Sequence, residues 1–178
     1  MTDQRVCLVT GAGRGIGRAA AVRLAAAGHR VALTARSADQ LAETAAKCGA
    51  GSIVIPADIT APGAVDEVFS RVEAELGPVD VLVANAGTAS SAPLPKITDE
   101  EWQRIIDLNL TAPFRCLRRA VPSMKQRRYG RIVVIGSVAS KRGEPYIAAY
   151  TSAKHGALGL VRAAAAELAT SGVTVNAV

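Results

Sequence analysis

Short apolar runs alternate with helical periods along the whole chain. Within the runs, apolar residues are nearly continuous, which is typical of strands that a sheet buries on both faces. The runs that predict strands are Val6–Val9, Val31–Leu33, Ser52–Ile55, Val79–Ala84, Arg131–Ile135 and Val173–Val178. This alternation predicts an α/β fold, a doubly wound parallel sheet with right-handed crossovers and helices on both faces.

The stretches between these runs carry helix signals. Two apolar stripes have helical spacing, namely Ile16, Ala20 and Leu24, and Val65, Val68, Phe69, Val72 and Leu76. Four glycines follow helical stretches, where a C-terminal cap would lie: Gly28, Gly49, Gly77 and Gly172. Thr98 and Glu101 have the spacing of a capping box, which predicts that a helix begins near Thr98, after a loop over Thr88–Pro95.

Length and composition narrow the class of protein. The 178 residues, 49% hydrophobic and 20% charged, suit one domain over 1–178 with a packed core. No apolar run approaches the roughly 20 residues that span a bilayer, so we expect no membrane protein. Met1–Arg5 leads directly into the first apolar run, which predicts no signal peptide.

The positions of the cysteines and histidines predict a reducing compartment and no metal site. Cys7, Cys48 and Cys116 lie far apart without metal-ligand spacing, so we expect free thiols in the cytoplasm. His29 and His155 are too scattered to build a zinc site.

The net charge of +6 is unevenly distributed. Seven of the 13 basic residues after residue 90 lie in one stretch: Arg115, Arg118, Arg119, Lys125, Arg127, Arg128 and Arg131. This stretch is either a solvated helix face or a site that attracts an anionic substrate or carrier. We expect no nucleic-acid binding, because only 3% of the residues are aromatic and platforms for stacking bases are scarce.

The first strand runs into a glycine-rich loop, TGAGRGIG at residues 10–17. Glycines allow a tight turn and let the backbone approach a pyrophosphate, and the following helix N-terminus offers free N–H groups. The spacing is TGxxxGxG rather than GxGxxG, since Ile16 stands at the third glycine position. The loop therefore predicts a dinucleotide site, with a structural turn as the alternative.

The end of the second strand suggests which dinucleotide binds. NAD sites commonly place an acid about 20 residues after the loop, to hold the ribose 2′-hydroxyl. Residues 33–37 contain no acid, and Arg36 stands there while Arg14 lies inside the loop. Positive charge suits a 2′-phosphate, so NADP(H) is favoured and NAD(H) stays possible. The alternative is that both arginines are surface cations.

Tyr150 and Lys154 have the spacing that places two side chains on one helix face. A nearby ammonium favours phenolate over phenol, so such a tyrosine can exchange a proton with a carbonyl or alcohol oxygen. Ser137, at the end of the fifth strand, can hydrogen-bond the same oxygen. The alternative is an exposed amphipathic helix face.

Taken in order, TGxxxGxG, Asn85-Ala86-Gly87, Ser137 and YxxxK resemble the short-chain dehydrogenase/reductase family over essentially the whole chain. The resemblance implies a Rossmann-type sheet and an NAD(P)-dependent enzyme that interconverts a ketone and a secondary alcohol. It implies a tetrad in which Tyr150 is the acid–base and Lys154 favours its ionised form. Ser137 would orient the carbonyl, so that Ser137 and Tyr150 contact substrate, and Asn109 would take part in a proton relay.

The same resemblance implies the cofactor site. Asp58 would contact the adenine ring, and Asn85-Ala86-Gly87 would support the sheet beside the cofactor. The implied cofactor-binding residues are Gly11, Arg14, Gly15, Ile16, Gly17, Arg36, Asp58, Ile59, Asn85, Ala86, Gly87, Tyr150 and Lys154.

Within the family, the chain looks most like reductases of 3-oxoacyl thioesters on acyl carrier protein or coenzyme A. The cations of residues 127–131 suit either carrier, but Ser171 stands where such reductases often have a second basic residue. A sugar, steroid or other secondary alcohol stays open as the substrate, as does a non-catalytic NADP-binding scaffold.

The resemblance also implies a homo-oligomer, a dimer or tetramer. Its usual contact helices correspond to the arginine-rich helix after Thr111 and to the helix of Tyr150, which continues into the small residues Ala163–Ala166. Family members continue past the sixth strand into a Pro-Gly turn, a mobile substrate lid and a seventh strand. These 178 residues would then lack part of the substrate pocket.

Overall fold

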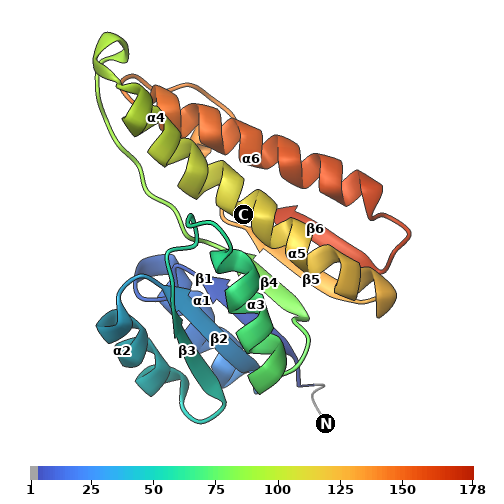
Figure 1. Ribbon diagram of the computed structural model, residues 1–178. Helices are drawn as coiled ribbons and strands as arrows, with labels where there is room; N and C mark the ends of the chain where they lie inside the picture. Colours follow the sequence, from blue (N-terminus) through green and yellow to red (C-terminus); the bar gives the residue numbers. More distant parts are fainter. Residues whose placement is uncertain (1–3) are drawn as a thin grey trace.

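The computed structural model describes residues 4–178 and contains one six-stranded parallel sheet (Figure 1). The strands are β1 (Val6–Thr10), β2 (Arg30–Ala35), β3 (Ser52–Pro56), β4 (Val81–Ala84), β5 (Gly130–Val134) and β6 (Val173–Ala177). Their order is β3-β2-β1-β4-β5-β6, so the predicted doubly wound sheet is confirmed. The predicted lack of a signal peptide rests partly on residues 1–3, which lie outside the described residues.

The helices cover the sheet on both faces. They are α1 (Gly15–Ala26), α2 (Ala38–Cys48), α3 (Ala64–Glu75), α4 (Asp99–Ile106), α5 (Ala112–Gln126) and α6 (Ala148–Glu167). A π-helical turn, η2 (Asp107–Thr111), joins α4 to α5, and two short 3₁₀ turns are η1 (Leu94–Lys96) and η3 (Val138–Ser140). No helix within residues 4–178 is both long and apolar enough to cross a membrane.

Alternate residues of β1 enter two separate apolar clusters. Val6 and Leu8 pack with residues of α3, α5 and α6, whereas Cys7 and Val9 pack with residues of α1 and α2. Every residue of β1 is buried, as the continuous apolar pattern predicts for a central strand.

The structure adds to one helix pattern and corrects another. The stripe of Ile16, Ala20 and Leu24 is not the most buried face of α1: Ile16 is 62% exposed, and Gly17 and Ala21 are buried. The first turn of α1 faces the cleft described below, so its apolar residue is not needed for the core. Gly172 does not cap a helix, since α6 ends at Glu167 and Gly172 lies immediately before β6.

The start of α4 is close to the prediction. The Thr98 hydroxyl accepts a hydrogen bond from the Glu101 N–H at 3.2 Å, which is half of a capping box. The Glu101 carboxylate lies 3.5 Å from Arg104 on the next turn of the helix.

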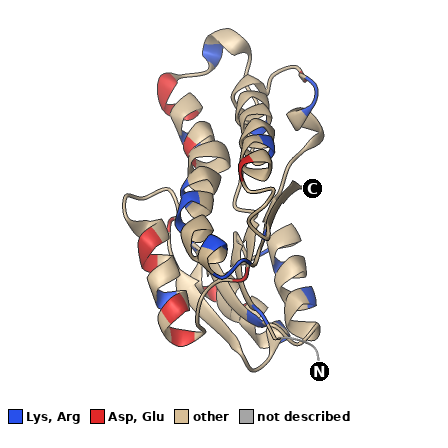
Figure 2. Cartoon of the chain, turned by 90° about the vertical axis from the view of Figure 1, so that its right-hand side faces the viewer, with Lys and Arg blue, Asp and Glu red and all other residues tan. Residues whose placement is uncertain are grey.

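The arginine-rich stretch is not simply a solvated face. Arg119 of α5 pairs with Glu73 of α3 at 2.6 Å, and Figure 2 shows the acidic α3 beside α5 with its basic residues. Arg127 pairs with the buried Asp80 and also donates to the Val79 carbonyl at 2.7 Å. Asp80 accepts the Val6 N–H at 3.0 Å as well. This Arg127–Asp80 pair therefore ties α5 to the starts of β1 and β4.

Two buried thiols make the free energy of unfolding depend on pH in the alkaline range. Burial raises the pKa of Cys7 and of Cys116 to about 12, with Asp80 adding to the shift at Cys7. The unfolded thiols ionise near pH 9, so the folded state loses relative stability as pH rises from about 9 to about 12. We expect urea unfolding to show a shallower fall in the free energy of unfolding over this range for Cys116→Ala than for the wild type. Parallel curves for the two proteins would contradict the assignment.

Candidate active site and cofactor cleft

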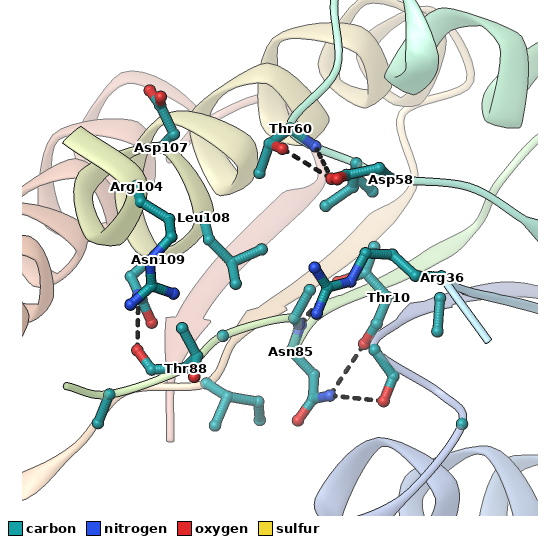
Figure 3. Close-up of a pocket in the computed structure, with 18 of the residues that line it drawn as sticks. Thr10, Arg36, Asp58, Thr60, Asn85, Thr88, Arg104, Asp107, Leu108 and Asn109 are labelled. Carbon is teal, nitrogen blue, oxygen red and sulfur yellow. Dashed lines mark hydrogen bonds between the residues drawn. The ribbon is translucent and has the colours of Figure 1, made fainter. Parts of the chain in front are cut away.

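A cavity of about 1390 Å³ opens at the carboxyl ends of the central strands. Its lining comes from the loops after β1, β2, β3, β4 and β5 and from one face of α4 and α6 (Figure 3). From β1 the sheet extends through β2 and β3 on one side, and through β4, β5 and β6 on the other. The cavity therefore lies where the strand order reverses, the usual place for a ligand in an open α/β sheet.

The glycine loop forms the floor of this cavity. A Cβ atom built on Gly17 would overlap the Gly11 carbonyl oxygen and the Asn85 amide, so this approach requires glycine. Gly11 and Gly15 have positive φ angles of 65° and 55°. Within residues 4–178, nothing apart from the neighbouring residues lies within 4 Å of a Cβ built on Gly15, so the loop leaves open space where a bound group can lie against its backbone.

Asn85 fastens this loop to the end of β4. Its side-chain amide donates to the carbonyls of Thr10 and Gly11 at 2.9 and 3.2 Å (Figure 3). In return, the Thr10 hydroxyl accepts the N–H groups of Asn85 and Ala86, both at 3.0 Å. Asn85 thus lies against the glycine loop, and Ala86 and Gly87 line the same cavity.

The positive charges predicted for a 2′-phosphate also line the cavity. Arg14, Arg36 and Asp58 all contribute to its wall, and Figure 3 shows Arg36 close to Asp58. The pKa of Asp58 is lowered, first by the hydrogen bond from the Thr60 hydroxyl at 2.7 Å, then by the Thr60 N–H, with a smaller effect of Arg36. Asp58 is therefore a carboxylate at neutral pH, and it accepts its hydrogen bonds from Thr60.

Tyr150 and Lys154 line the same cavity from α6. The Lys154 Nζ lies 5.7 Å from the centre of the Tyr150 ring, so the two residues share a face as predicted. Lys154 is buried, and its Nζ donates to the Ile135 carbonyl at 2.6 Å. Burial lowers the pKa of Lys154, because the charged ammonium loses hydration.

Ser137 is adjacent to the cavity but is not among the residues that line it. It caps η3: its hydroxyl oxygen accepts the Ala139 N–H at 3.1 Å, and its N–H donates to the Ser140 hydroxyl at 3.1 Å. The hydroxyl proton is not used in these bonds and can still be donated.

Asn109 lies in the π turn between α4 and α5. In this turn the Ala112 N–H donates to Asp107, five residues back, and the Asn109 amide donates to the Ile105 carbonyl at 3.0 Å and to Thr88 at 2.9 Å. Its Oδ1 is buried and has no hydrogen-bond partner among residues 4–178. A Cβ on Gly87 would lie 2.8 Å from this oxygen, so this close approach favours glycine at position 87.

The structure adds a wall that the sequence analysis missed. One face of α4 and the π turn borders the cavity through Gln103, Arg104, Asp107 and Leu108 (Figure 3). The i, i+4 spacing of Arg104 and Leu108 could have shown that these two share a face. Which face of α4 packs against α6 depends on long-range contacts, so that spacing could not place them in the site.

Comparison with known proteins agrees with this geometry. Residues 5–178 match the family model described as short chain dehydrogenase. A 3-oxoacyl-[acyl-carrier-protein] reductase, MabA, of Mycobacterium tuberculosis is 43% identical over 98% of this chain and 67% of its own length. The reductase FabG of Escherichia coli is 40% identical, over 99% of this chain and 72% of its own.

Two further matches support the assignment. An acetoacetyl-CoA reductase of Shinella zoogloeoides is 41% identical over 98% of this chain and 72% of its own length. A solved structure from Sinorhizobium meliloti, described as a short-chain alcohol dehydrogenase, has a TM-score of 0.93 and 38% identity, over 97% of this chain and 70% of that one. The chain therefore spans about two thirds to three quarters of the length of these proteins, and it belongs to the short-chain dehydrogenase/reductase family of oxidoreductases.

Proposed function

We propose that the chain acts as an NADP(H)-dependent reductase that converts the ketone of a 3-oxoacyl thioester into a secondary alcohol. The observation that carries the proposal is one shared cavity, with the glycine loop as its floor and the Tyr150–Lys154 pair on its wall. The open space beside Gly15 and the two arginines that line the cavity fit a dinucleotide with an extra phosphate. The names of the similar reductases support the thioester.

In this proposal the residues of the tetrad have separate tasks. The nicotinamide, when bound, supplies the hydride, and the chain positions the groups and moves the proton. Tyr150 donates its hydroxyl proton to the carbonyl oxygen as negative charge develops there. Lys154, fixed by the Ile135 carbonyl, keeps a positive charge near the tyrosine when it is protonated. Ser137 donates a hydrogen bond to the substrate oxygen.

Asn109 takes part in the proton relay. Its buried Oδ1 has an unused acceptor site, which is where a water that reprotonates the lysine would be held. Hydrogen bonds to Thr88 and Ile105 fix the amide, so its Oδ1 keeps one orientation toward such a water.

The cofactor preference can be tested at Arg36. Arg36→Asp places a carboxylate where the 2′-phosphate would lie, next to Asp58, and a carboxylate repels phosphate but can accept from a ribose hydroxyl. We expect the ratio of kcat/KM with NADPH to that with NADH to fall by about 100-fold or more, in line with the loss of one charged hydrogen bond and a new repulsion. Arg71→Asp, in an exposed pair on α3, is the control. An unchanged ratio in Arg36→Asp would overturn the NADP(H) assignment.

The activity itself needs one assay panel on the full-length protein. NADPH oxidation is followed with acetoacetyl-coenzyme A, an acetoacetyl carrier-protein thioester, simple ketones, sugars and steroids. Turnover of the thioesters supports the proposal. A preference for another carbonyl compound corrects the substrate, and cofactor binding without any oxidation supports a non-catalytic scaffold.

The assembly and location follow from the same proposal. We expect a dimer or tetramer that joins through α5 and the helix of Tyr150, to be measured by light scattering on the full-length protein. A location in the cytoplasm stays a prediction from the unpaired cysteines.

A further inference from the structure

The back of the glycine loop is held by a cluster that the proposed reaction does not use. Thr44 of α2 is fully buried, and its hydroxyl lies 3.0 Å from the Ala12 carbonyl oxygen and 3.0 Å from the Gln40 carbonyl oxygen. The Arg18 Nε of α1 donates to the Gly13 carbonyl and to the Thr44 hydroxyl, both at 3.0 Å. The same guanidinium pairs with Glu43 at 2.9 Å.

Peptide geometry converts these contacts into a direction for the N–H groups. In a trans peptide the carbonyl of one residue and the N–H of the next point in opposite directions, and the described chain has no cis peptide bond. Thr44, by holding the Ala12 carbonyl, turns the Gly13 N–H away from α2. Arg18 holds the Gly13 carbonyl, and the Arg14 N–H of that peptide therefore points away from the Arg18 guanidinium.

The peptide between Gly11 and Ala12 has the same arrangement, with its carbonyl and its N–H bound on opposite sides. The Gly11 carbonyl is bound by Asn85, and the Ala12 N–H on the other side of that peptide donates to the Thr34 carbonyl at 3.2 Å. Gly13 and Arg14 both line the cavity, so their N–H groups are the ones that the contacts with α1 and α2 direct toward a ligand.

We infer that Arg18 and Thr44 are positioning residues for the pyrophosphate: together they hold two loop carbonyls at the back so that the N–H groups of Gly13 and Arg14 face the bound anion. Neither residue lines the cavity. The inference rests on the proposed dinucleotide site and adds to it the residues that orient the loop.

Thr44→Val keeps the shape of the side chain and removes the hydroxyl. The Ala12 carbonyl and the Arg18 Nε then lose a partner, and the loop peptides can rotate. We expect the dissociation constant for the preferred cofactor to rise about tenfold, the size of one lost hydrogen bond, in calorimetric titrations of the full-length protein. Thr44→Ser keeps the hydroxyl and should return the constant to within about twofold of the wild type.

A ligand without the pyrophosphate separates positioning from general damage. Binding of 2′-AMP, or of adenosine if the wild type prefers NADH, should change less than about twofold in Thr44→Val. Thr174→Val, at an exposed position of β6, is the matched control and should leave all constants unchanged. Equal loss of both ligands, or no loss of the cofactor, would overturn the role of Thr44. If the wild type binds neither NADPH nor NADH, the proposed function itself fails.

Discussion

Tyr150→Phe is expected to lower turnover by about 100- to 10,000-fold, the usual contribution of a general acid or base. The variant keeps the ring on the cavity wall and removes only the hydroxyl that would donate the proton. The dissociation constant for NADPH should stay within about twofold, since the lost group acts on the substrate oxygen. Single-turnover oxidation of NADPH and a fluorescence titration of the cofactor, both on full-length protein, measure the two quantities separately.

Tyr129→Phe provides the matched control for this change. Tyr129 lies directly before β5, at the end of the sheet opposite the cavity, and the guanidinium carbons of Arg5 and Arg131 lie 4.0 and 4.5 Å from the centre of its ring. The same loss of a hydroxyl there should leave turnover unchanged. Full activity of Tyr150→Phe would show that Tyr150 is not the acid–base. Equal losses of activity in the two variants would indicate a general effect on folding.

Gly17→Ala is expected to weaken NADPH binding by about 100-fold or more. The added methyl group would occupy space held by the Gly11 carbonyl and by the amide of Asn85. Relief requires the loop to move away from β4, which breaks hydrogen bonds at Thr10 and Gly11, and overpacking of this kind costs about 1–3 kcal/mol before those bonds are counted. Isothermal titration measures the binding and calorimetric melting measures the stability.

Gly143→Ala is the matched control for a methyl group added to glycine. Among the described residues, none apart from its chain neighbours lies within 4 Å of a Cβ built on Gly143, and Gly143 does not have a positive φ angle. We expect cofactor binding within about twofold of the wild type for this variant. Unchanged binding by Gly17→Ala would mean that the loop accepts the methyl group without moving, contrary to the close packing seen here.

The parts of the structure that follow from short sequence patterns were predicted well. All six strands lie at or within a few residues of their apolar runs. The central strands leave a continuous signal because they bury both faces, whereas the edge strands β3 and β6 are partly exposed. The glycine loop and the pair Tyr150 and Lys154 were equally visible, since a tight turn and a shared helix face depend only on local spacing.

The parts of the structure that depend on contacts between residues far apart in the sequence were not predicted. The π turn at Asp107–Thr111 has no signal in local spacing, yet it determines where the amide of Asn109 lies. The spacing of Ile16, Ala20 and Leu24 does not show which side of α1 is buried, because periodicity cannot tell a helix face that meets the sheet from one that meets a cleft. The cavity-facing residues of α4 and the contacts of Arg18 and Thr44 depend on how α1 packs with α2 and how α4 packs with α6.

The buried ion pair of Arg127 and Asp80 has a consequence for how this chain can diverge. It locks the starts of β1 and β4 to α5, at the end of the sheet opposite the cleft. Loops at the cleft end, such as residues 88–93, can therefore accept insertions and exchanges without loosening that anchor. New substrate ranges can therefore arise through changes in the loops at the cleft end, while the ion pair at the other end of the sheet keeps the fold intact.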